Sequence, residues 1–226
     1  MRINVSFLVT PSFKILSFIT LLVTQSTLSF NAIANELGSK HFKQCIVCHG
    51  ESGQGNKALK SPALAGQSDW YIARQLENFN KKHRGTHSKD VAGQQMAAIV
   101  SPVDFSNKIN SLSKYISTLP TYKENSPTAK SISKETLKNG SRYYQGKCGA
   151  CHGATAQGNK LFNAPKLNTL SEAYLLKQMN NFVQGIRGTH KEDKYGRQMA
   201  MMAKTTSGTE LQDIIAYISY LGTTGH

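Results

Sequence analysis

The sequence has few cysteines, few acidic residues and a single tryptophan. Its 226 residues contain four cysteines, and 13 Asp+Glu stand against 27 Lys+Arg. Four cysteines are too few for a disulfide-dense miniature scaffold. Beyond the N-terminal region, no stretch approaches the roughly 20 apolar residues of a membrane-spanning helix, which excludes a polytopic membrane protein. The shortage of acid leaves a net charge of +14, which suits nucleic acid, an anionic membrane or an acidic protein as partner.

No run alternates at period two for long enough to predict a sheet, and the apolar residues recur at helical spacing instead. The hydrophobic share of 39% is enough for a globular core. Ser68 and Ser171 stand at the N-cap positions of two such helices. The expected core stripes are Ile72, Leu76 and Phe79; Leu175, Met179 and Phe182; Ile109, Leu112, Ile116 and Leu119; and Leu211, Ile214, Ile218 and Leu221. We predict an all-α fold.

The first 34 residues have the layout of a secretory signal peptide. They contain no acid, carry Arg2 and Lys14, hold a mostly apolar stretch at 15–23 and end in Ala-Ile-Ala at 32–34. An uncleaved anchor helix is the alternative, but the apolar run is short. We expect a cleavable export signal at 1–34 and an exported mature chain with a net charge of +12.

The rest of the chain is a tandem repeat with an offset of 103 residues, which becomes 102 near the end. The repeated segments include Cys-x-x-Cys-His-Gly at 45–50 and 148–153, Arg-Gly-Thr-His at 84–87 and 187–190, and Tyr-Ile-Ser at 115–117 and 217–219. Two copies indicate two domains and not a solenoid. Two prolines and mostly polar residues mark a linker between them. We predict domains at 35–120 and 133–226, joined by a linker at 121–132.

Each Cys-x-x-Cys-His motif is typical of a covalent c-type haem site. The two thiols of a motif form thioethers with the haem, and the adjacent histidine ligates the iron. The alternatives are a zinc ion shared by the two cysteine pairs, or a disulfide within each motif. Zinc would leave the repeated histidines unexplained. We therefore expect two covalently bound haem c groups, held by the residues Cys45, Cys48 and His49 in the first domain and Cys148, Cys151 and His152 in the second.

The second iron ligand is expected downstream in each domain. Met96 follows His49 by 47 residues, and Met199 follows His152 by the same interval. Methionine/histidine ligation is the arrangement of electron-transfer cytochromes c. Methionine also fills cores, and Met201 and Met202 are rivals, but their counterparts in the first repeat are Ala98 and Ile99. Bis-histidine ligation by the repeated residues His87 and His190 is a further alternative, although both lie in a polar segment that suits a loop.

Other repeated residues are candidates for contact with the cofactor. Pro62 and Pro165 each follow their histidine by 13 residues, and their carbonyls are placed to accept the second imidazole N–H. Arg84 and Arg187 could pair with haem propionates, since guanidinium forms a fork for carboxylate, or could be solvated surface residues. The aromatic residues Trp70, Tyr71 and Tyr174 could pack on the haem or simply between helices.

These motifs together resemble the dihaem cytochrome c4 family. The resemblance rests on the duplicated haem motif, Pro-Ala-Leu-Ala-Gly-Gln at 62–67, the Tyr-x-x-x-Gln helices and the late methionines, and it covers the mature chain. It implies two class I cytochrome c domains with haem edges facing through propionates, in a periplasmic electron carrier that often serves a terminal oxidase. The sequence departs from the family at 165–170, where Pro-Lys-Leu-Asn-Thr-Leu replaces the usual segment.

With two protein ligands on each iron, no open position for substrate remains, so we expect a single-electron carrier and not an enzyme. Its expected partners are redox proteins, either a terminal oxidase or an upstream quinol-oxidising complex, and no small-molecule substrate. The alternatives are a dihaem subunit of a dehydrogenase such as a sulfide-oxidising flavocytochrome, a dihaem peroxidase, and a metal-binding structural module without haem.

The positive charge is spread over both domains. Residues 35–120 carry 11 basic and 6 acidic side chains, a net of +5, and residues 133–226 carry 12 and 6, a net of +6. This even distribution argues against nucleic acid as partner. It suits docking on an acidic protein surface or peripheral association with an anionic membrane. The densest local run is Lys-Lys-His-Arg at 81–84.

Overall fold

The computed structural model describes residues 35–101, 103–121 and 132–224. The predicted export signal at 1–34 and nearly all of the predicted linker lie outside the described residues. The described residues form helices and loops without a strand, apart from two isolated β-bridges, so the all-α prediction is confirmed. In the same part of the chain, no helix combines the length and the apolar character that crossing a bilayer requires.

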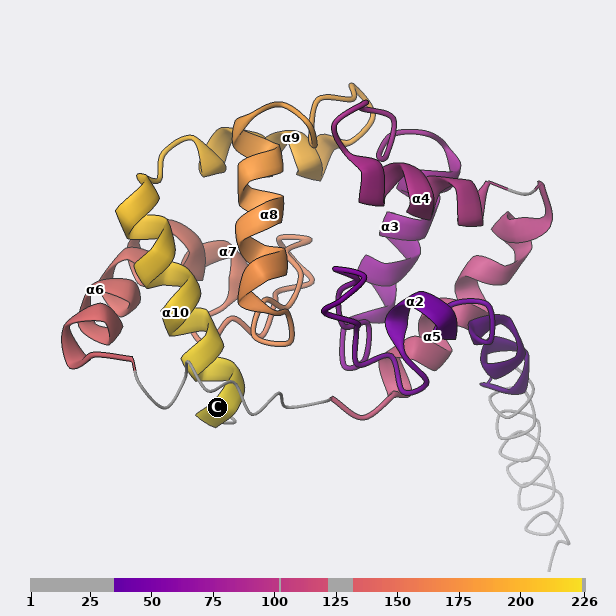
Figure 1. Ribbon diagram of the computed structural model, residues 1–226, viewed down its shortest axis with the longest axis horizontal. Coiled ribbons are helices and arrows are strands. Elements are labelled where there is room, and N and C mark those ends of the chain that lie inside the picture. Colours follow the sequence, from indigo (N-terminus) through magenta and orange to yellow (C-terminus); the bar gives the residue numbers. More distant parts are fainter. Residues whose placement is uncertain (1–34, 102, 122–131, 225–226) are drawn as a thin grey trace, which may run out of the picture.

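The two sequence repeats fold into two helical halves that lie side by side (Figure 1). In the first half, residues 35–42 are helical. They are followed by α2 (Ile46–His49), α3 (Asp69–Asn80), α4 (Val91–Val100), the 3₁₀-helix η1 (Val103–Lys108) and α5 (Ile109–Thr118). The second half contains α6 (Lys134–Tyr144), the π-helix η3 (Gln145–Gly149), α7 (Ala150–His152), α8 (Glu172–Val183), α9 (Lys194–Ala203) and α10 (Gly208–Thr224).

Each half has its own hydrophobic core, built from the predicted apolar stripes. In the first core α3 packs on α4 and α5, and Leu112 and Ile116 of α5 are fully buried. In the second, α10 packs on α6 and α8, and Tyr144, Ile214 and Ile218 are buried. The helical spacing in the sequence therefore predicted the core faces correctly.

The two predicted N-caps behave differently. The Ser171 hydroxyl accepts a hydrogen bond from the Tyr174 amide at 3.4 Å, as an N-cap does. Ser68 occupies the predicted N-cap position of α3, which confirms the boundary, but its side chain makes no capping hydrogen bond. The first-turn amide of Trp70 is satisfied by the carboxylate of Asp69 at 2.7 Å instead.

The second domain contains one more residue than the first just before its haem motif. The ring pairs Phe42–Tyr115 and Tyr144–Tyr217, at 5.6 and 5.8 Å, correspond to each other at an offset of 102, whereas the cysteines correspond at 103. The extra residue falls in η3, and a π-helix is the form a helix takes when it accommodates one inserted residue. Near the start of α10 the second domain is one residue shorter than the first, which restores the offset of 102. In the first domain the 3₁₀-helix η1 precedes α5, whereas no such helix separates α9 from α10 in the second.

The two domains meet across an approximately two-fold symmetric contact between α3 and α8 and the loops that follow them. Arg84 donates to Gln75 Oε1 of its own domain at 2.7 Å and to Gln178 Oε1 of the other at 3.1 Å. Arg187 donates in the mirrored way, to Gln178 at 2.7 Å and to Gln75 at 3.0 Å. Both arginines are 8% exposed, so the alternative of solvated surface arginines is wrong.

Further contacts tie the domains at either side of the arginines. The Gln67 amide nitrogen donates to the Lys166 carbonyl at 3.0 Å, and the Lys166 ammonium donates to the Gly66 carbonyl at 2.7 Å. The segment 165–170, where the sequence departs from the family that it resembles, thus contributes to the interface. On the other side, the His83 and His190 rings stack at 4.4 Å. With His83 stacked and Arg84 buried, residues 81–84 do not form one exposed basic patch.

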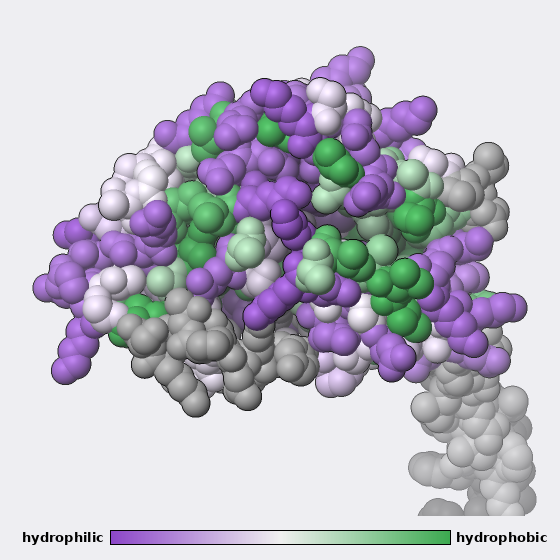
Figure 2. Space-filling model, in the orientation of Figure 1, coloured by the Kyte–Doolittle hydropathy of each residue, from purple (hydrophilic) through white to green (hydrophobic). Residues whose placement is uncertain are grey.

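The visible surface is mostly hydrophilic, and its hydrophobic residues form small separate groups (Figure 2). Exposed apolar side chains in both domains include Val47, Leu161 and Met201.

Candidate functional site

Each Cys-x-x-Cys-His motif forms a single helical turn that ends at its histidine. In the first motif the His49 amide donates to the Cys45 carbonyl at 2.8 Å, so Cys45, Cys48 and His49 share one side of the turn. The following glycines, Gly50 and Gly153, have φ of 81° and 83°, a left-handed conformation that other residues rarely adopt. This explains why both motifs continue with glycine.

All four cysteines are free thiols, which rules out a disulfide within either motif. Burial and the neighbouring Cys48 raise the pKa of Cys45 to about 11. Burial, together with Cys151, likewise raises the pKa of Cys148 to about 11. No group of three or more His, Cys, Asp or Glu residues suited to a metal ion occurs among the described residues, which also argues against the shared zinc site. The four cysteines are therefore available for thioether formation.

Both histidines are buried and oriented by the predicted prolines. Nδ1 of His49 lies 2.9 Å from the Pro62 carbonyl, and Nδ1 of His152 lies 2.9 Å from the Pro165 carbonyl. A carbonyl can only accept, so Nδ1 carries the proton and donates it. Burial lowers the pKa of both histidines, which favours the neutral imidazole. Each Nε2 therefore keeps its lone pair for an iron ion.

The two repeated methionines lie at matching places in the fold. Met96 is in α4 and packs half-buried against the first core, and Met199 is half-buried in α9. The rivals Met201 and Met202 are 65% and 43% exposed. Met199 is therefore the least exposed methionine of α9. The thioether of Met96 or Met199 is available to an iron ion, and the iron–sulfur bond itself stays a prediction.

The alternative ligands His87 and His190 lie in loops at the domain boundary. Their Nδ1 atoms accept hydrogen bonds from the backbone amides of Lys89 and Glu192, at 3.1 and 3.2 Å. His190 also stacks on His83. These contacts give the two histidines a structural role in the loops and argue against bis-histidine ligation.

The buried arginines meet the requirement for a cofactor that carries carboxylates. The Nε atoms of Arg84 and Arg187 are buried and have no hydrogen-bond partner. Neither guanidinium forms an ion pair within the described residues, although both are buried close to the same two glutamines. Asp193 is near enough to Arg187 to interact with it electrostatically, but neither guanidinium is paired with a carboxylate of the described residues, and burying a charge without such a pair is costly. Haem propionates, which are carboxylates, would satisfy both the charge and the open N–H groups.

The predicted aromatic residues contact arginines at the interface. The Tyr174 hydroxyl accepts from Arg84 at 3.3 Å, and the Tyr71 hydroxyl from Arg187 at 3.5 Å. Trp70 packs against the guanidinium of Arg74, which lies 5.2 Å from the ring centroid. These contacts favour the packing role for the three aromatic residues.

Two pairs of residues have roles that the sequence did not predict, although Gln75 and Gln178 end the two Tyr-x-x-x-Gln segments noted above. Gln75 and Gln178 link the arginines across the interface. Asp90 and Asp193 are buried N-caps of α4 and α9, and their carboxylates accept from the amides of Gly93 and Gly196 at 3.1 and 3.0 Å. Both pairs occur at the repeat offset of 103, so a comparison of every polar position between the repeats singles out these residues, although it does not show what they contact.

Comparison with known proteins agrees with this architecture. The cytochrome c family model matches residues 35–120 and again residues 137–222. Cytochrome c4 of Azotobacter vinelandii is 27% identical over 217 aligned residues, covering 91% of this chain and 97% of that protein. A thiosulfate dehydrogenase electron acceptor of Stutzerimonas stutzeri strain A1501 is 26% identical over 183 residues, covering 79% of each.

Among solved structures, cytochrome c4 of Acidithiobacillus ferrooxidans matches with a TM-score of 0.61 and 25% identity, over 79% of this chain and 99% of that one. Each of the two segments that match the family model contains one copy of the duplicated haem motif. The chain therefore belongs to the cytochrome c family, as a tandem two-domain electron carrier of the cytochrome c4 type that binds two covalent haem c groups.

Proposed function

We propose that the protein works in the periplasm and carries single electrons between respiratory partners, toward a terminal oxidase. The observation that carries this proposal is the duplication of the ligand set. In each domain a buried histidine points its free Nε2 away from a proline carbonyl, and a half-buried methionine follows 47 residues later. Two such sites leave no coordination position for a substrate.

The residues of each domain have distinct roles in this proposal. Cys45 and Cys48, like Cys148 and Cys151, attach a haem through thioethers. The imidazole of His49 or His152 and the thioether of Met96 or Met199 would ligate the iron, a ligand pair that raises the potential of a haem. When bound, haem c supplies a one-electron iron couple, and the protein tunes it through these ligands and through burial.

Arg84 and Arg187 are proposed to bind one or more propionates of the two haems. Their buried Nε atoms, which have no hydrogen-bond partner among the described residues, support this role. Each guanidinium also donates a hydrogen bond to a glutamine of the other domain. An arginine bound to a propionate would therefore link the charge of that haem to the contact between the domains. The arrangement would favour electron transfer between the two haems within one chain.

Export is supported by the acid-free, apolar layout of residues 1–34. Covalent haem attachment in a protein of this family agrees with a site outside the cytoplasm. Up to four propionates would offset part of the positive charge, and the remaining excess suits an acidic redox partner or peripheral contact with an anionic membrane.

A second candidate function is that of an electron-accepting partner or subunit of a dehydrogenase. Similarity to a thiosulfate dehydrogenase electron acceptor, at 26% identity over 79% of the chain, favours a role of this kind. The two functions differ in the upstream partner, so co-purification with a catalytic subunit would select the dehydrogenase role. The proposed haem sites are the same in both.

Methionine ligation is tested by substitution at three positions. We expect Met96→Ala and Met199→Ala each to remove half of the weak red absorption band of Met-ligated ferric haem and to lower the potential of one haem. Met201→Ala, at an exposed position of the same helix as Met199, is the matched control and should leave the band intact. A full band in Met199→Ala would disprove that assignment, and a blank haem stain on a denaturing gel of the wild type would overturn the function.

A further inference from the structure

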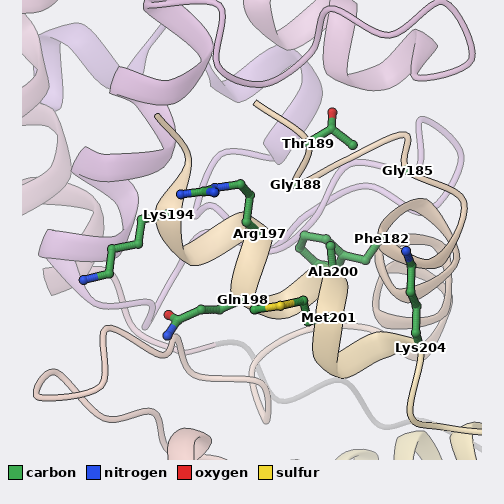
Figure 3. Close-up of a pocket in the computed structure, with 10 residues that line it drawn as sticks. All are labelled: Phe182, Gly185, Gly188, Thr189, Lys194, Arg197, Gln198, Ala200, Met201 and Lys204. Carbon is green, nitrogen blue, oxygen red and sulfur yellow. The ribbon is translucent and has the colours of Figure 1, made fainter. Parts of the chain in front are cut away.

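The outer face of α9 forms a groove lined by basic side chains, and the equivalent positions in the first domain are uncharged. The groove has a volume of about 380 Å³ and lies between α9, Phe182 of α8 and the loop that carries Gly188 (Figure 3). Lys194, Arg197 and Lys204 line it, together with Gln198 and Met201. We call this feature the α9 groove.

The cations of the α9 groove are exposed and available. Lys194, Arg197 and Lys204 are exposed, and none forms an ion pair within the described part of the chain. No acidic residue lines the groove. The adjacent Asp193 is buried and its carboxylate caps α9 by accepting from Gly196, while Glu192 lies outside the groove. The groove is therefore a concave surface of uncompensated positive charge.

The centre of the groove is apolar and adaptable. Met201 is 65% exposed and lies between the basic side chains on the same helical face. A flexible thioether can repack against different surfaces, and methionine is common where a protein binds more than one partner. An apolar centre with a charged rim is the usual composition of a transient protein interface.

The first domain has the same helix without the charge. At the repeat offset of 103, Lys194, Arg197 and Lys204 correspond to Val91, Gln94 and Ser101. These three positions are also exposed. The two domains carry nearly equal net charge, so the difference lies in where the charge is placed and not in its amount.

We propose that the α9 groove is the docking surface for the acidic face of a redox-protein partner, so that electrons enter or leave through the second domain. The inference rests on the proposed electron-carrier function. The groove lies on the outer face of the helix that carries Met199, so a docked partner is separated from that ligand by one helix, roughly 10 Å in diameter. Charge complementarity at this surface would accelerate encounter in a salt-dependent way.

The test uses the holoprotein and plastocyanin, an acidic copper protein, as probe. One electron leaves the reduced dihaem protein and converts copper(II) to copper(I). The triple variant K194Q/R197Q/K204Q removes three positive charges from the groove. The matched control V91E/Q94E/S101E changes the net charge by the same amount at the equivalent face of the first domain.

We expect the groove variant to lower the second-order rate constant about tenfold at low ionic strength and to flatten its salt dependence, and the control to lower it less than about threefold. Carbodiimide cross-linking, which joins lysines to carboxylates, should place cross-links at Lys194 and Lys204 independently of electron transfer. Equal rates for both variants, or cross-links confined to other lysines, would overturn the proposal.

Two further readouts separate the alternatives. If the groove variant loses binding to phosphatidylglycerol vesicles while its rate with plastocyanin is unchanged, the groove is a membrane contact and the proposal is wrong. A redox titration of the same samples reports the proposed function separately, because failure of that function removes reversible haem reduction in every variant, whereas failure of the docking proposal leaves it intact.

Discussion

The two domains are alike in their ligand sites and differ in the structure around them. The distances from histidine nitrogen to proline carbonyl are both 2.9 Å, and the histidine-to-methionine interval is 47 residues in both. The helix before the haem motif, the start of the last helix and the outer face of the methionine helix all differ. The repeated features are those that a haem requires, and the differing ones are free to specialise each domain.

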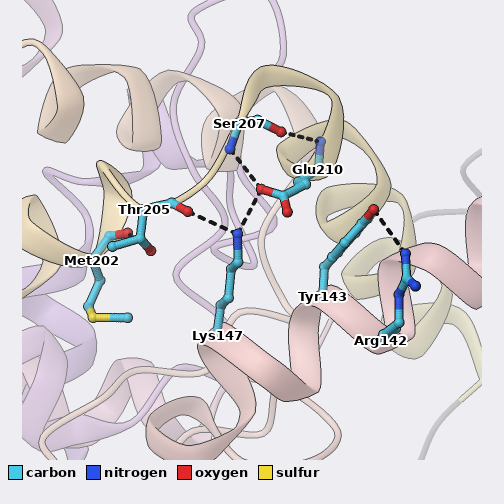
Figure 4. A network of polar contacts seen from close by, with 7 residues as sticks. All are labelled: Arg142, Tyr143, Lys147, Met202, Thr205, Ser207 and Glu210. Carbon is cyan, nitrogen blue, oxygen red and sulfur yellow. Dashed lines mark hydrogen bonds and ion pairs between the residues drawn. The ribbon is translucent and has the colours of Figure 1, made fainter.

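One difference is a polar network found in the second domain (Figure 4). Lys147 of η3 donates to Glu210 at 2.7 Å and to the Thr205 carbonyl at 2.9 Å. Ser207 and Glu210 form a reciprocal capping box at the start of α10, in which the Ser207 amide donates to the Glu210 carboxylate at 2.9 Å. The π-helix that contains the inserted residue therefore also carries Lys147, whose hydrogen bond to Glu210 joins the haem motif to the last helix.

The largest expected effect separates the two haem sites. The double variants C45S/C48S and C148S/C151S should each reduce covalent haem from two groups to one, because serine forms no thioether. Mass spectrometry of the intact chain and a haem stain measure this directly. Loss of both haems in either variant would show that the two sites do not assemble independently.

The next effect tests the symmetry of the interface. Arg84→Gln and Arg187→Gln should each lower the free energy of unfolding by about 2 kcal/mol, because each removes hydrogen bonds from a buried charged group. Denaturant unfolding of the holoprotein measures the loss. Arg142→Gln, at an exposed site, is the control and should change it by less than about 0.5 kcal/mol. A loss for one interface arginine alone would contradict the symmetric contact.

The smallest effect concerns acid stability of the second domain. Hydrogen bonds from Lys147 and from Ser207 hold the pKa of Glu210 below its usual value. A carboxyl whose pKa is lowered by folding contributes stability above its unfolded pKa, and that contribution is lost as pH falls. Glu210→Gln should therefore lower Tm at neutral pH but not near pH 3. Glu77→Gln, in an exposed pair of the first domain, should change Tm less. A Tm difference for Glu210→Gln that persists in acid would contradict this assignment.

The sequence predicted features that depend on spacing and missed those that depend on contact between the domains. The tandem repeat, the helical stripes and the histidine–proline pairs each follow from regular intervals within one domain. The bridging role of Gln75 and Gln178 depends on how two folded surfaces meet, which no interval in the sequence encodes. The repeated segments recognised in the sequence begin at the haem motif. The residues before the motif match at an offset of 102 instead of 103, and this difference, which marks the inserted residue in η3, was therefore missed.

Burial explains the remaining differences between expectation and structure. An arginine in a polar Arg-Gly-Thr-His segment has the sequence context of a surface residue, yet Arg84 and Arg187 are covered by the opposite domain. The even net charge of the two domains likewise concealed the concentration of cations on α9, because composition does not record which residues share a helical face.

A redox titration of the purified wild-type protein, followed by visible spectra, tests the central claim most directly. Two haem sites with histidine and methionine ligands predict two reversible one-electron steps and a red ferric band whose intensity corresponds to two Met-ligated haems per chain. A band corresponding to one haem would mean that one iron lacks its methionine ligand, which would contradict the assigned ligand set and reopen catalysis at that site.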